Sequence, residues 1–301
     1  GGSLFFAGAA QGGSSCLLFS VYILKFRSII GEGSLETQGP AREARPTIYL
    51  LGDAHLGAQQ SAREEEKHDR LISFWRSLHG RSDCQLVLCG DLFDFWFEYR
   101  HVIPRRHFRI LVQLADLVDS GVPVDYLAGN HDFWMGSFLR EEAGVALHEE
   151  GLLLLQAGRR IFLCHGDGLM AGDHLYRLMK RVLRHPAAIA GYRLLHPDLG
   201  IPFALFCSHL SRESARDKHH DDTDYRAWAC RQIDAGHDLV VLGHSHVPAL
   251  LPHGGGWYVN AGAWMEGFTY AMIEAGVPSL RQWDGREGRP YEPLPAPNDQ
   301  A

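Results

Sequence analysis

The chain has 301 residues, enough for one or two domains of ordinary size. Its hydrophobic content of 46% and charged content of 22% are those of a folded globular protein and exclude an intrinsically disordered one. A net charge of −7 argues against a nucleic-acid-binding protein, which needs a basic surface.

Residues 1–45 are expected to form an N-terminal extension without a catalytic role. The most apolar part, residues 16–26, is about half as long as the roughly 20 residues that a spanning helix needs. No basic segment precedes it, as a secretory signal would require. The alternative is a segment that leans on a membrane. The six cysteines are scattered without a CxxC pair, which favours a reducing compartment over a disulfide framework.

From residue 47 onward, short apolar runs alternate with segments of helical periodicity. The expected elements, in chain order, are a strand at 47–53, a helix at 70–78, a strand at 85–91, a helix at 108–121, strands at 122–130, 152–158 and 159–167, a long helical interval, and strands at 238–246 and 257–264. Strands that alternate with helices early and form hairpin-like pairs later predict a layered α/β sandwich.

Five of these strand-like runs end in polar side chains. The clusters are Asp53 with His55, Asp91, Asn130 with His131 and Asp132, His165 with Asp167, and His244 with His246. Because loops at the carboxyl ends of strands in α/β sheets converge on one crevice, we expect these side chains to meet. The alternative is five ordinary turns capped by Asp and Asn. One cluster alone would favour turns, whereas five favour a site.

The donor atoms of these clusters are nitrogen and oxygen, without thiolate. Such a set suits a pair of transition-metal ions such as Mn, Fe, Zn or Co rather than a structural zinc ion. Asp53 and His55 are two residues apart, so in an extended segment both side chains leave the same face. His244 and His246 have the same spacing. Asp91 is the candidate carboxylate to bridge two cations.

The order D-x-H, G-D, G-N-H-D, H and G-H-x-H over residues 47–275 resembles the calcineurin-like metallophosphoesterases. Within that superfamily, the segments GDLFDFWFEY, HGDGLMAGDHLY and GHSHVPA resemble the UDP-2,3-diacylglucosamine hydrolases of lipid A biosynthesis. The resemblance implies a four-layer αββα sandwich over residues 46–285. It also implies a helical cap inserted at about 173–220. By composition, residues 286–301 are expected to form a Pro-rich tail.

The resemblance further implies two divalent metal ions, expected to be Mn. One would be held by Asp53, His55 and His246, and the other by Asn130, His165 and His244, with Asp91 between them. The implied reaction is hydrolysis of a pyrophosphate at the α-phosphorus, which releases UMP and 2,3-diacylglucosamine 1-phosphate. Such a pair lowers the pKa of a water molecule and neutralises charge on the phosphate. The implied location is the cytoplasmic face of the inner membrane of a Gram-negative bacterium.

His131 follows a predicted metal ligand directly, so its side chain is expected to point elsewhere. It either donates a hydrogen bond or proton to a phosphate oxygen, which we favour, or packs in the turn. Asp132 either orients His131 or caps the segment that follows. We therefore expect Asp91, Asn130 and His131 to be the catalytic residues.

The segment between His165 and His244 is unusual in charge. Residues 174–218 carry eight basic and three acidic side chains, a net of +5 within a chain of −7, and apolar residues are interleaved with them. This composition predicts a helical cap that receives acyl chains and rests on an anionic membrane. The alternative is an amphipathic helical pair with a solvated basic side.

Substrate contacts are implied by the resemblance. They are Asn130, His131, Asp173, Ser211, Arg212, Lys218 and His244. The aromatic residues Phe93, Phe95, Trp96 and Phe97 could line a substrate pocket or belong to the core.

Two other functions are weighed against a lipid hydrolase. A phosphoesterase for a soluble nucleotide or a phosphoprotein would not need the basic, apolar insertion. A scaffold that has lost its metals would lack ligands, whereas all seven predicted positions hold competent side chains.

Overall fold

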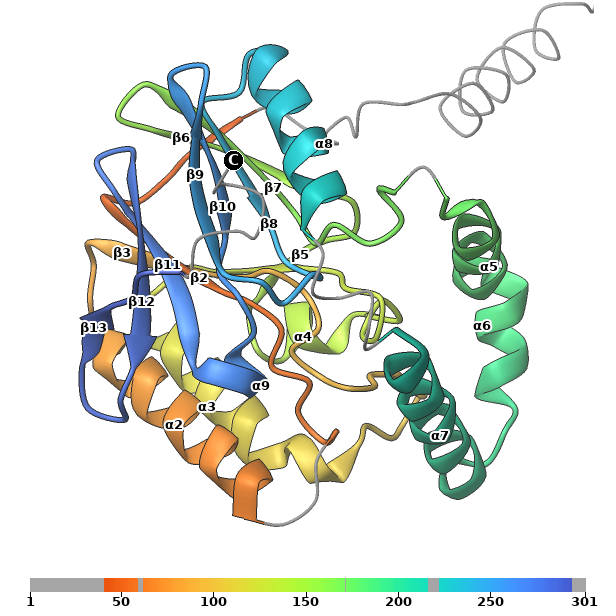
Figure 1. Cartoon of the computed structure of the whole chain (residues 1–301). Coiled ribbons are helices and arrows are strands. Elements are labelled where there is room, and N and C mark those ends of the chain that lie inside the picture. Colours follow the sequence, from red (N-terminus) through yellow and green to blue (C-terminus); the bar gives the residue numbers. More distant parts are fainter. Residues whose placement is uncertain (1–40, 59–61, 171, 216–221, 294–301) are drawn as a thin grey trace, which may run out of the picture. The chain divides into compact units, whose positions relative to one another are not determined.

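The structure is a computed structural model that describes residues 41–58, 62–170, 172–215 and 222–293, without the side chains of residues 210–215. The apolar segment 16–26 and the end of the Pro-rich tail therefore lie outside the described residues. Two β-sheets lie face to face, and helices cover their outer faces (Figure 1). The helices of these outer layers are α2 (Ala62–Leu78) and α3 (Phe108–Asp119) on one side, and α8 (Thr223–Asp234) on the other.

One sheet has seven strands. They are β2 (Thr47–Leu51), β3 (Cys84–Leu88), β4 (Val124–Leu127), β5 (Ala146–His148), β11 (Thr269–Glu274), β12 (Val277–Trp283) and β13 (Gly288–Pro290). Their order in the sheet is β13-β12-β11-β2-β3-β4-β5. Strands β2 to β5 are parallel, and β11 to β13 add antiparallel strands at the other edge.

The other sheet has six strands. They are β1 (Arg42–Glu43), β6 (Leu152–Gln156), β7 (Arg159–Cys164), β8 (Leu239–Leu242), β9 (Ala249–His253) and β10 (Gly256–Asn260). Their order is β1-β6-β7-β8-β10-β9. Strands β7, β8 and β10 are parallel. Strand β6 pairs antiparallel to β7 and parallel to β1, and β9 pairs antiparallel to β10.

Strand β2 shows how the layers pack. Ile48 and Leu50 belong to the apolar core between the two sheets, whereas Tyr49 and Leu51 belong to the core beneath α2 and α3. This division follows from the period of two along a strand, in which successive side chains point to opposite faces. On the far side, Trp228 of α8 lies on Phe162 of β7, with ring centroids 6.2 Å apart. The predicted αββα sandwich is confirmed.

The parallel strands bring the predicted polar clusters to one edge of the sandwich. Strands β2, β3 and β4 run parallel in one sheet, and β7 and β8 run parallel in the other. The polar residues follow the carboxyl ends of these strands: Asp53, Asp91, Asn130, His165 and His244.

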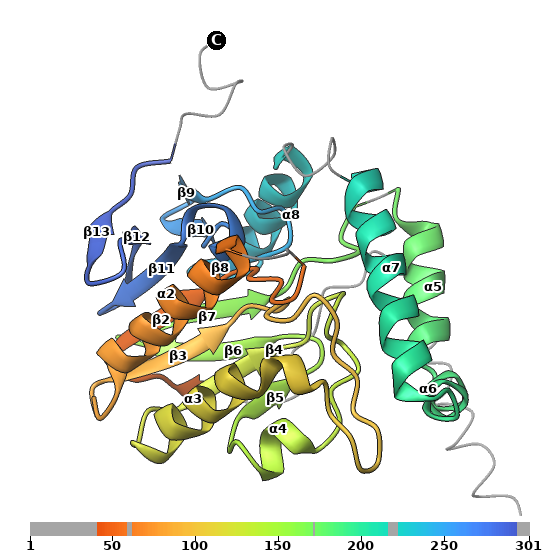
Figure 2. The same ribbon diagram turned by 90° about the horizontal axis from the view of Figure 1, so that it is seen from below.

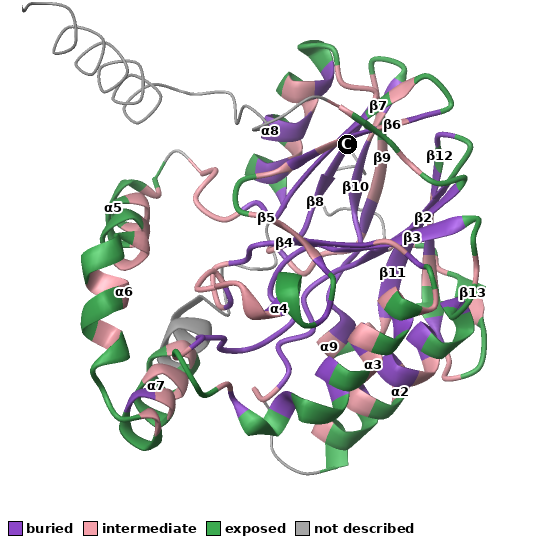
Figure 3. Ribbon diagram, turned by 180° about the vertical axis from the view of Figure 1, so that it is seen from behind, coloured by how far each residue is buried: buried purple, intermediate pink, exposed green. Residues whose placement is uncertain are grey.

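Three helices stand beside this edge, outside the sandwich (Figure 2). They are α5 (His174–Arg184), α6 (Pro186–Arg193) and α7 (Pro197–Ala215). Neither α5 nor α6 has a buried residue, and both are coloured mainly as exposed in Figure 3. No helix in the described ranges is long and apolar enough to cross a membrane. The interval in which a cap is expected is thus helical.

The structure differs from the sequence-based elements at several places, and strands β5, β9, β11 and β12 have no counterpart among the expected strands. Both sheets continue past the expected limits of 46–285, since β1 lies before residue 46 and β13 lies after residue 285. Helix α2 begins at Ala62 rather than near residue 70, because its polar first half has no apolar stripe to reveal it. The remaining short helices are α4 (Phe138–Glu141), α9 (Trp264–Gly267) and the 3-10 turn η1 (Arg105–His107).

Candidate metal centre

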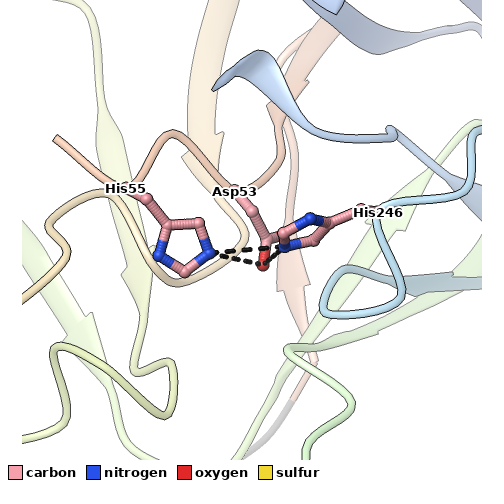
Figure 4. A group of neighbouring side chains, drawn as sticks. All are labelled: Asp53, His55 and His246. Atoms are coloured by element: carbon pink, nitrogen blue, oxygen red, sulfur yellow. Dashed lines mark hydrogen bonds and ion pairs between the residues drawn. The ribbon is translucent and has the colours of Figure 1, made fainter. Parts of the chain in front are cut away.

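The first group of converging side chains is Asp53, His55 and His246 (Figure 4). Nε2 of His246 lies 3.2 Å from Oδ2 of Asp53, and Nε2 of His55 lies 3.3 Å from Nε2 of His246. Oδ2 of Asp53 is buried and accepts no hydrogen bond from the described residues. One carboxylate oxygen and two imidazole nitrogens thus point into one small space, which is a donor set that fits a divalent cation.

The second group is Asp91, His165 and His244. Nε2 of His165 lies 3.4 Å from Oδ2 of Asp91 and 3.0 Å from the amide oxygen of Asn130. The His244 ring stands 5.1 Å from that of His165, centroid to centroid. Because the Nδ1 atom of His165 is 2.8 Å from the carbonyl oxygen of Cys89, which only accepts, Nδ1 carries the hydrogen and Nε2 is directed at the group.

Asp91 connects the two groups. Its Oδ2 atom lies 3.4 Å from Nε2 of His165 and 3.7 Å from Nε2 of His55. A single oxygen therefore faces an imidazole from each group. The seven residues predicted to hold metal are brought together at this one place, and their arrangement could hold two cations.

Several of these residues have a strained backbone. The φ angles are positive at His55 (42°), Asp91 (51°), His244 (65°) and His246 (60°), a region that non-glycine residues rarely adopt. Such conformations persist only where the surrounding structure enforces them, and they gather at functional sites. Here the backbone N–H of His55 donates to the carbonyl of Asp91 at 2.9 Å, and that of His244 donates to Oδ1 of Asp53 at 3.1 Å.

The electrostatics of the centre favour a cation. Burial alone would raise the pKa of Asp53, but the imidazole of His246 outweighs it and lowers that pKa. Burial alone would lower the pKa of His165, but the carboxylates of Asp91 and Asp53 raise it to about 10. The pKa of His246 is raised to about 10 for the same reason, by Asp53. Two buried carboxylates thus attract positive charge, and a metal ion would replace these protons.

A buried lysine holds the loop after β2. Lys67 of α2 is fully buried, and its Nζ donates to the carbonyls of Ala54 at 3.2 Å and His55 at 3.0 Å and pairs with Glu64 at 2.9 Å. Sequence reasoning missed it. The signal was present, because Lys67 stands at helical spacing from Leu71 and Phe74 and so occupies a position of the buried stripe.

A second missed network lies beneath the loop that carries His244 and His246. Ser245 of this loop donates to the buried carboxylate of Asp222 at 2.9 Å. The amide of Asn260, at the end of β10, donates to Oγ of Ser245 at 2.9 Å and to the carbonyl of Gly243 at 3.1 Å. The polar end of an otherwise apolar strand, WYVN, was the available signal.

Asp132 takes neither of the two roles that the sequence left open. Its buried carboxylate accepts hydrogen bonds from the backbone N–H groups of Asp91 (3.2 Å), Phe93 (3.3 Å) and Gly129 (3.0 Å), and from the hydroxyl of Tyr126. Burial, and then the charge of Asp91, raises the pKa of Asp132 to about 6. The residue joins the loops after β3 and β4.

His131 lies at the rim of the centre. Its backbone N–H donates to Oδ1 of Asp91 at 2.8 Å, and its ring stands edge-on to His55 with centroids 4.6 Å apart. Nδ1 of the ring lies 3.1 Å from the carbonyl of Asp94 and 2.9 Å from Oγ of Ser208 on α7. The contacts of His131 with Asp94 and Ser208 had not been predicted, because these three residues lie far apart in the sequence.

The implied substrate contacts fall at different places. Asp173 directly precedes α5. The pKa of Tyr225 is raised first by burial and then by the nearby carboxylate of Asp173. The ring of Tyr225 lies 6.0 Å from that of His244, centroid to centroid. Ser211 and Arg212 lie on α7, where side chains are not described, and Lys218 lies outside the described residues.

Four aromatic residues of the loop after β3 belong to the core. Phe93, Phe95, Trp96 and Phe97 are all buried. The rings of Phe93 and Trp96 stack at 4.7 Å, and Phe97 contacts Tyr192 of α6 at 4.5 Å. These rings support the loop and meet the insertion.

Comparison with known proteins agrees with this site. A family model for the calcineurin-like phosphoesterases matches residues 46–248. The UDP-2,3-diacylglucosamine hydrolase of Porphyromonas gingivalis is 32% identical over 221 residues, covering 67% of this chain and 84% of that protein. The enzyme of the same name from Pseudomonas fluorescens strain Pf-5 is 31% identical over 209 residues, covering 67% and 80%.

Among solved structures, a phosphoesterase from E. coli is 15% identical over 80% of this chain and 96% of that one, with a TM-score of 0.40, too low to add to the assignment. The family assignment therefore rests on the family match and on the converging donor side chains. The chain belongs to the calcineurin-like phosphoesterase family and is a metal-dependent hydrolase.

Proposed function

We propose that this protein hydrolyses the pyrophosphate bond of UDP-2,3-diacylglucosamine to UMP and 2,3-diacylglucosamine 1-phosphate, a step of lipid A biosynthesis. It would act with two Mn²⁺ ions at the cytoplasmic face of the inner membrane of a Gram-negative bacterium. The relatives that carry this name support the substrate. The observation that carries the reaction is Oδ2 of Asp91, which faces both His55 and His165.

In this proposal the two groups of the centre each hold one ion. Asp53, His55 and His246 would bind the first, Asn130, His165 and His244 the second, and Asp91 both. When bound, such a pair supplies a nucleophile from water at neutral pH and neutralises charge on the phosphate. The close approach of Asp53 to His246 and of Asn130 to His165 supports this division.

The chain's own residues would complete the reaction. With Nδ1 held by Asp94 and Ser208, the ring of His131 can present Nε2 to a phosphate oxygen and donate a hydrogen bond or proton there. Oδ1 of Asp91 is held by the backbone N–H of His131, which leaves Oδ2 for the ions. Asp173, Ser211, Arg212, Lys218 and His244 are the proposed contacts to the sugar and phosphates.

Helix α5 supports a lipid substrate because its basic side, not its apolar side, faces the protein. Lys180 pairs at 2.6 Å with Asp167, whose side chain is 5% exposed, and Arg177 donates to the carbonyls of Gly168 and Met170. The apolar residues Leu175, Leu178, Met179 and Val182 follow the i, i+3, i+4, i+7 spacing of one helix face, and all are exposed. Among the basic residues of α5, Arg177 and Lys180 contact the protein, whereas Arg181 is exposed, as the alternative of a solvated basic side expects.

Further exposed apolar side chains follow α5 along the chain. Leu194, which follows α6, is 88% exposed, and Leu199 and Phe203 of α7 are 71% and 61% exposed. We call the exposed apolar side chains of 174–206 the apolar cap surface: Leu175, Leu178, Met179, Val182, Leu194, Leu195, Leu199, Phe203 and Phe206. Apolar patches of this kind mark binding sites for lipids or proteins, and acyl chains would bury them.

The direct test is an assay of UMP release by the purified protein from UDP-2,3-diacylglucosamine, with and without Mn²⁺. UDP-N-acetylglucosamine, which has the same pyrophosphate but only an acetyl group at position 2 and a free hydroxyl at position 3, is the control substrate. We expect Mn²⁺-dependent release from the lipid and little from the soluble sugar. Turnover of the soluble sugar without turnover of the lipid would replace the lipid by a soluble substrate.

A further inference from the structure

We propose that Ser208 of α7 is a positioning residue that fixes the ring of His131 and so connects the helical insertion to the metal centre. The inference rests on the proposed function, in which His131 donates to a phosphate oxygen. Its basis is a set of hydrogen bonds among Ser208, His131 and Asp94. His131 and Asp94 belong to the sandwich, and Ser208 belongs to the insertion.

The contact defines which ring nitrogen of His131 carries hydrogen. Nδ1 lies 3.1 Å from the backbone carbonyl of Asp94, and a carbonyl only accepts, so Nδ1 is the donor. The hydroxyl of Ser208 donates to Oδ1 of Asp94 at 2.9 Å. Its lone pairs are then left for Nδ1–H of His131, which is 2.9 Å from Oγ. Each hydrogen of this set has an acceptor.

This arrangement also fixes the direction of the ring. Because Nδ1 is held against Asp94 and α7, Nε2 is the nitrogen that can reach a substrate. The ring stands at 87° to that of His55, so it packs over a residue that the proposed function assigns to a metal ion. A rotation of the ring would break both bonds to Nδ1. A donor held in one orientation is worth more to a reaction than one that must be ordered in each turnover.

Ser208 is the part of this set that comes from the insertion. The carboxylate of Asp94 is buried and lies between two imidazoles, 3.6 Å from Nδ1 of His131 and 3.7 Å from Nδ1 of His55. Helix α7 also carries Phe203 and Phe206 of the apolar cap surface. A lipid that binds α7 and shifts it would therefore shift the hydroxyl that holds His131.

A double-mutant cycle tests the proposal on the full chain. We expect Ser208→Ala to lower kcat about tenfold, the effect of one lost hydrogen bond, while KM changes less than about twofold. In the His131→Ala background, Ser208→Ala should lower kcat no further, because Ser208 acts only through the ring of His131, which that background already lacks. Ser208→Thr, which keeps the hydroxyl, should have the kcat of the wild type. Cys207→Ala, an exposed neighbour on α7, is the matched control and should keep the wild-type kcat.

Two results would overturn the proposal. One is a Ser208→Ala protein with the kcat of the wild type, and the other is an effect of Ser208→Ala that adds fully to that of His131→Ala. Nitrogen-15 NMR of the imidazoles gives a readout apart from activity, with His131 assigned from the spectrum of His131→Ala. The Nδ1–H form should dominate in both proteins because the carbonyl of Asp94 remains, but loss of the second acceptor in Ser208→Ala should shift the Nδ1 resonance, and an unchanged Nδ1 resonance would contradict the inference.

The cycle should be run on UDP-2,3-diacylglucosamine and on bis(p-nitrophenyl) phosphate, a soluble phosphodiester. Cleavage of the soluble compound alone would refute the proposed substrate, yet the cycle measured on it would still decide whether Ser208 acts through His131. Failure of the two proposals can thus be told apart.

Discussion

Oδ1 of Asp132 accepts a hydrogen bond from the backbone N–H of Asp91 at 3.2 Å. In the opposite direction, the backbone N–H of His131, next to Asp132, donates to the carboxylate of Asp91 at 2.8 Å. The loops after β3 and β4 are therefore joined by reciprocal hydrogen bonds, and these bonds fix the carboxylate that faces both groups of the centre. The GNHD segment is an organised part of the site rather than a polar turn.

The first prediction concerns this junction. Each oxygen of Asp132 accepts two hydrogen bonds. The amide NH₂ of Asp132→Asn would therefore face at least one backbone N–H donor: those of Asp91 and Gly129 at the Oδ1 position, or that of Phe93 at the Oδ2 position. Because an unpaired buried donor destabilises the folded state, we expect the free energy of unfolding of Asp132→Asn, measured in urea, to be about 1–3 kcal/mol lower than that of the wild type. Asp119→Asn, at the end of α3, is the control. A variant as stable as this control would show that the junction is dispensable.

The second prediction concerns Lys67. Lys67→Met keeps the length of the buried stem but leaves Glu64 and two carbonyls without the ammonium group. Breaking a fully buried ion pair costs about 3–5 kcal/mol. Because Glu64 is half-buried and still accepts from the backbone N–H of Gly57, we expect a loss of up to that size in urea unfolding, with weaker Mn²⁺ binding because the loop of His55 loosens. Arg76→Met, an exposed change on the same helix, should lose little. Equal midpoints for the two variants would count against this role.

The third prediction separates catalysis from metal binding at His131. His131→Ala should lower kcat by about 10²–10³-fold, in the range of a lost proton donor or charge-stabilising hydrogen bond. Its metal content, measured by mass spectrometry of the dialysed protein, should equal that of the wild type, because its ring belongs to neither proposed ligand set. Loss of metal together with activity would instead make His131 a ligand.

The fourth prediction concerns the apolar cap surface. Leu199→Glu with Phe203→Glu places two charges on exposed apolar positions of α7, which should hardly change stability. Turnover of UDP-2,3-diacylglucosamine in phosphatidylglycerol-containing vesicles should fall at least about tenfold if these residues meet lipid, since burying a charge in an acyl environment is costly. Val277→Glu, equally exposed on β12, is the matched control. If both proteins turn over the lipid alike, the surface does not meet lipid.

The fifth prediction concerns removal of metal. Treatment with a chelator should lower Tm, and Mn²⁺ should restore it, because an ion that binds only the folded state stabilises it by about 2.7 kcal/mol at one hundred times Kd. Asp91→Asn, which weakens the carboxylate shared by both groups, should respond much less to Mn²⁺. A Tm that is insensitive to Mn²⁺ in the wild type would argue against a metal centre in the fold.

Sequence patterns predicted the residues at the strand ends because two local rules meet there. An apolar run that ends in Gly and a polar pair reports both the strand and its loop, as at Asp53 and Asp91. The parallel strands then bring the ends together. The supporting residues could not be predicted in this way, because Asn260 and Ser208 act through contacts with segments distant in sequence.

A periodic pattern of apolar residues also does not tell whether the apolar face of a helix is buried or exposed. The stripe of α5 alone is compatible both with a lipid-facing cap and with an amphipathic pair whose apolar side is buried. The structure shows that Leu175 and Leu178 are exposed and that Lys180 and Arg177 contact the protein. The short strands β1 and β13 are too brief and too polar to give a periodic signal, so the sheets are wider than the sequence indicated.

Anomalous diffraction from a crystal of the Mn²⁺-loaded protein tests the two-ion centre most directly. We expect two manganese peaks about 3.5–4 Å apart, with the carboxylate of Asp91 between them. Asp53, His55 and His246 should lie around one peak, and Asn130, His165 and His244 around the other. A single peak, or two peaks that Asp91 does not join, would contradict the claim.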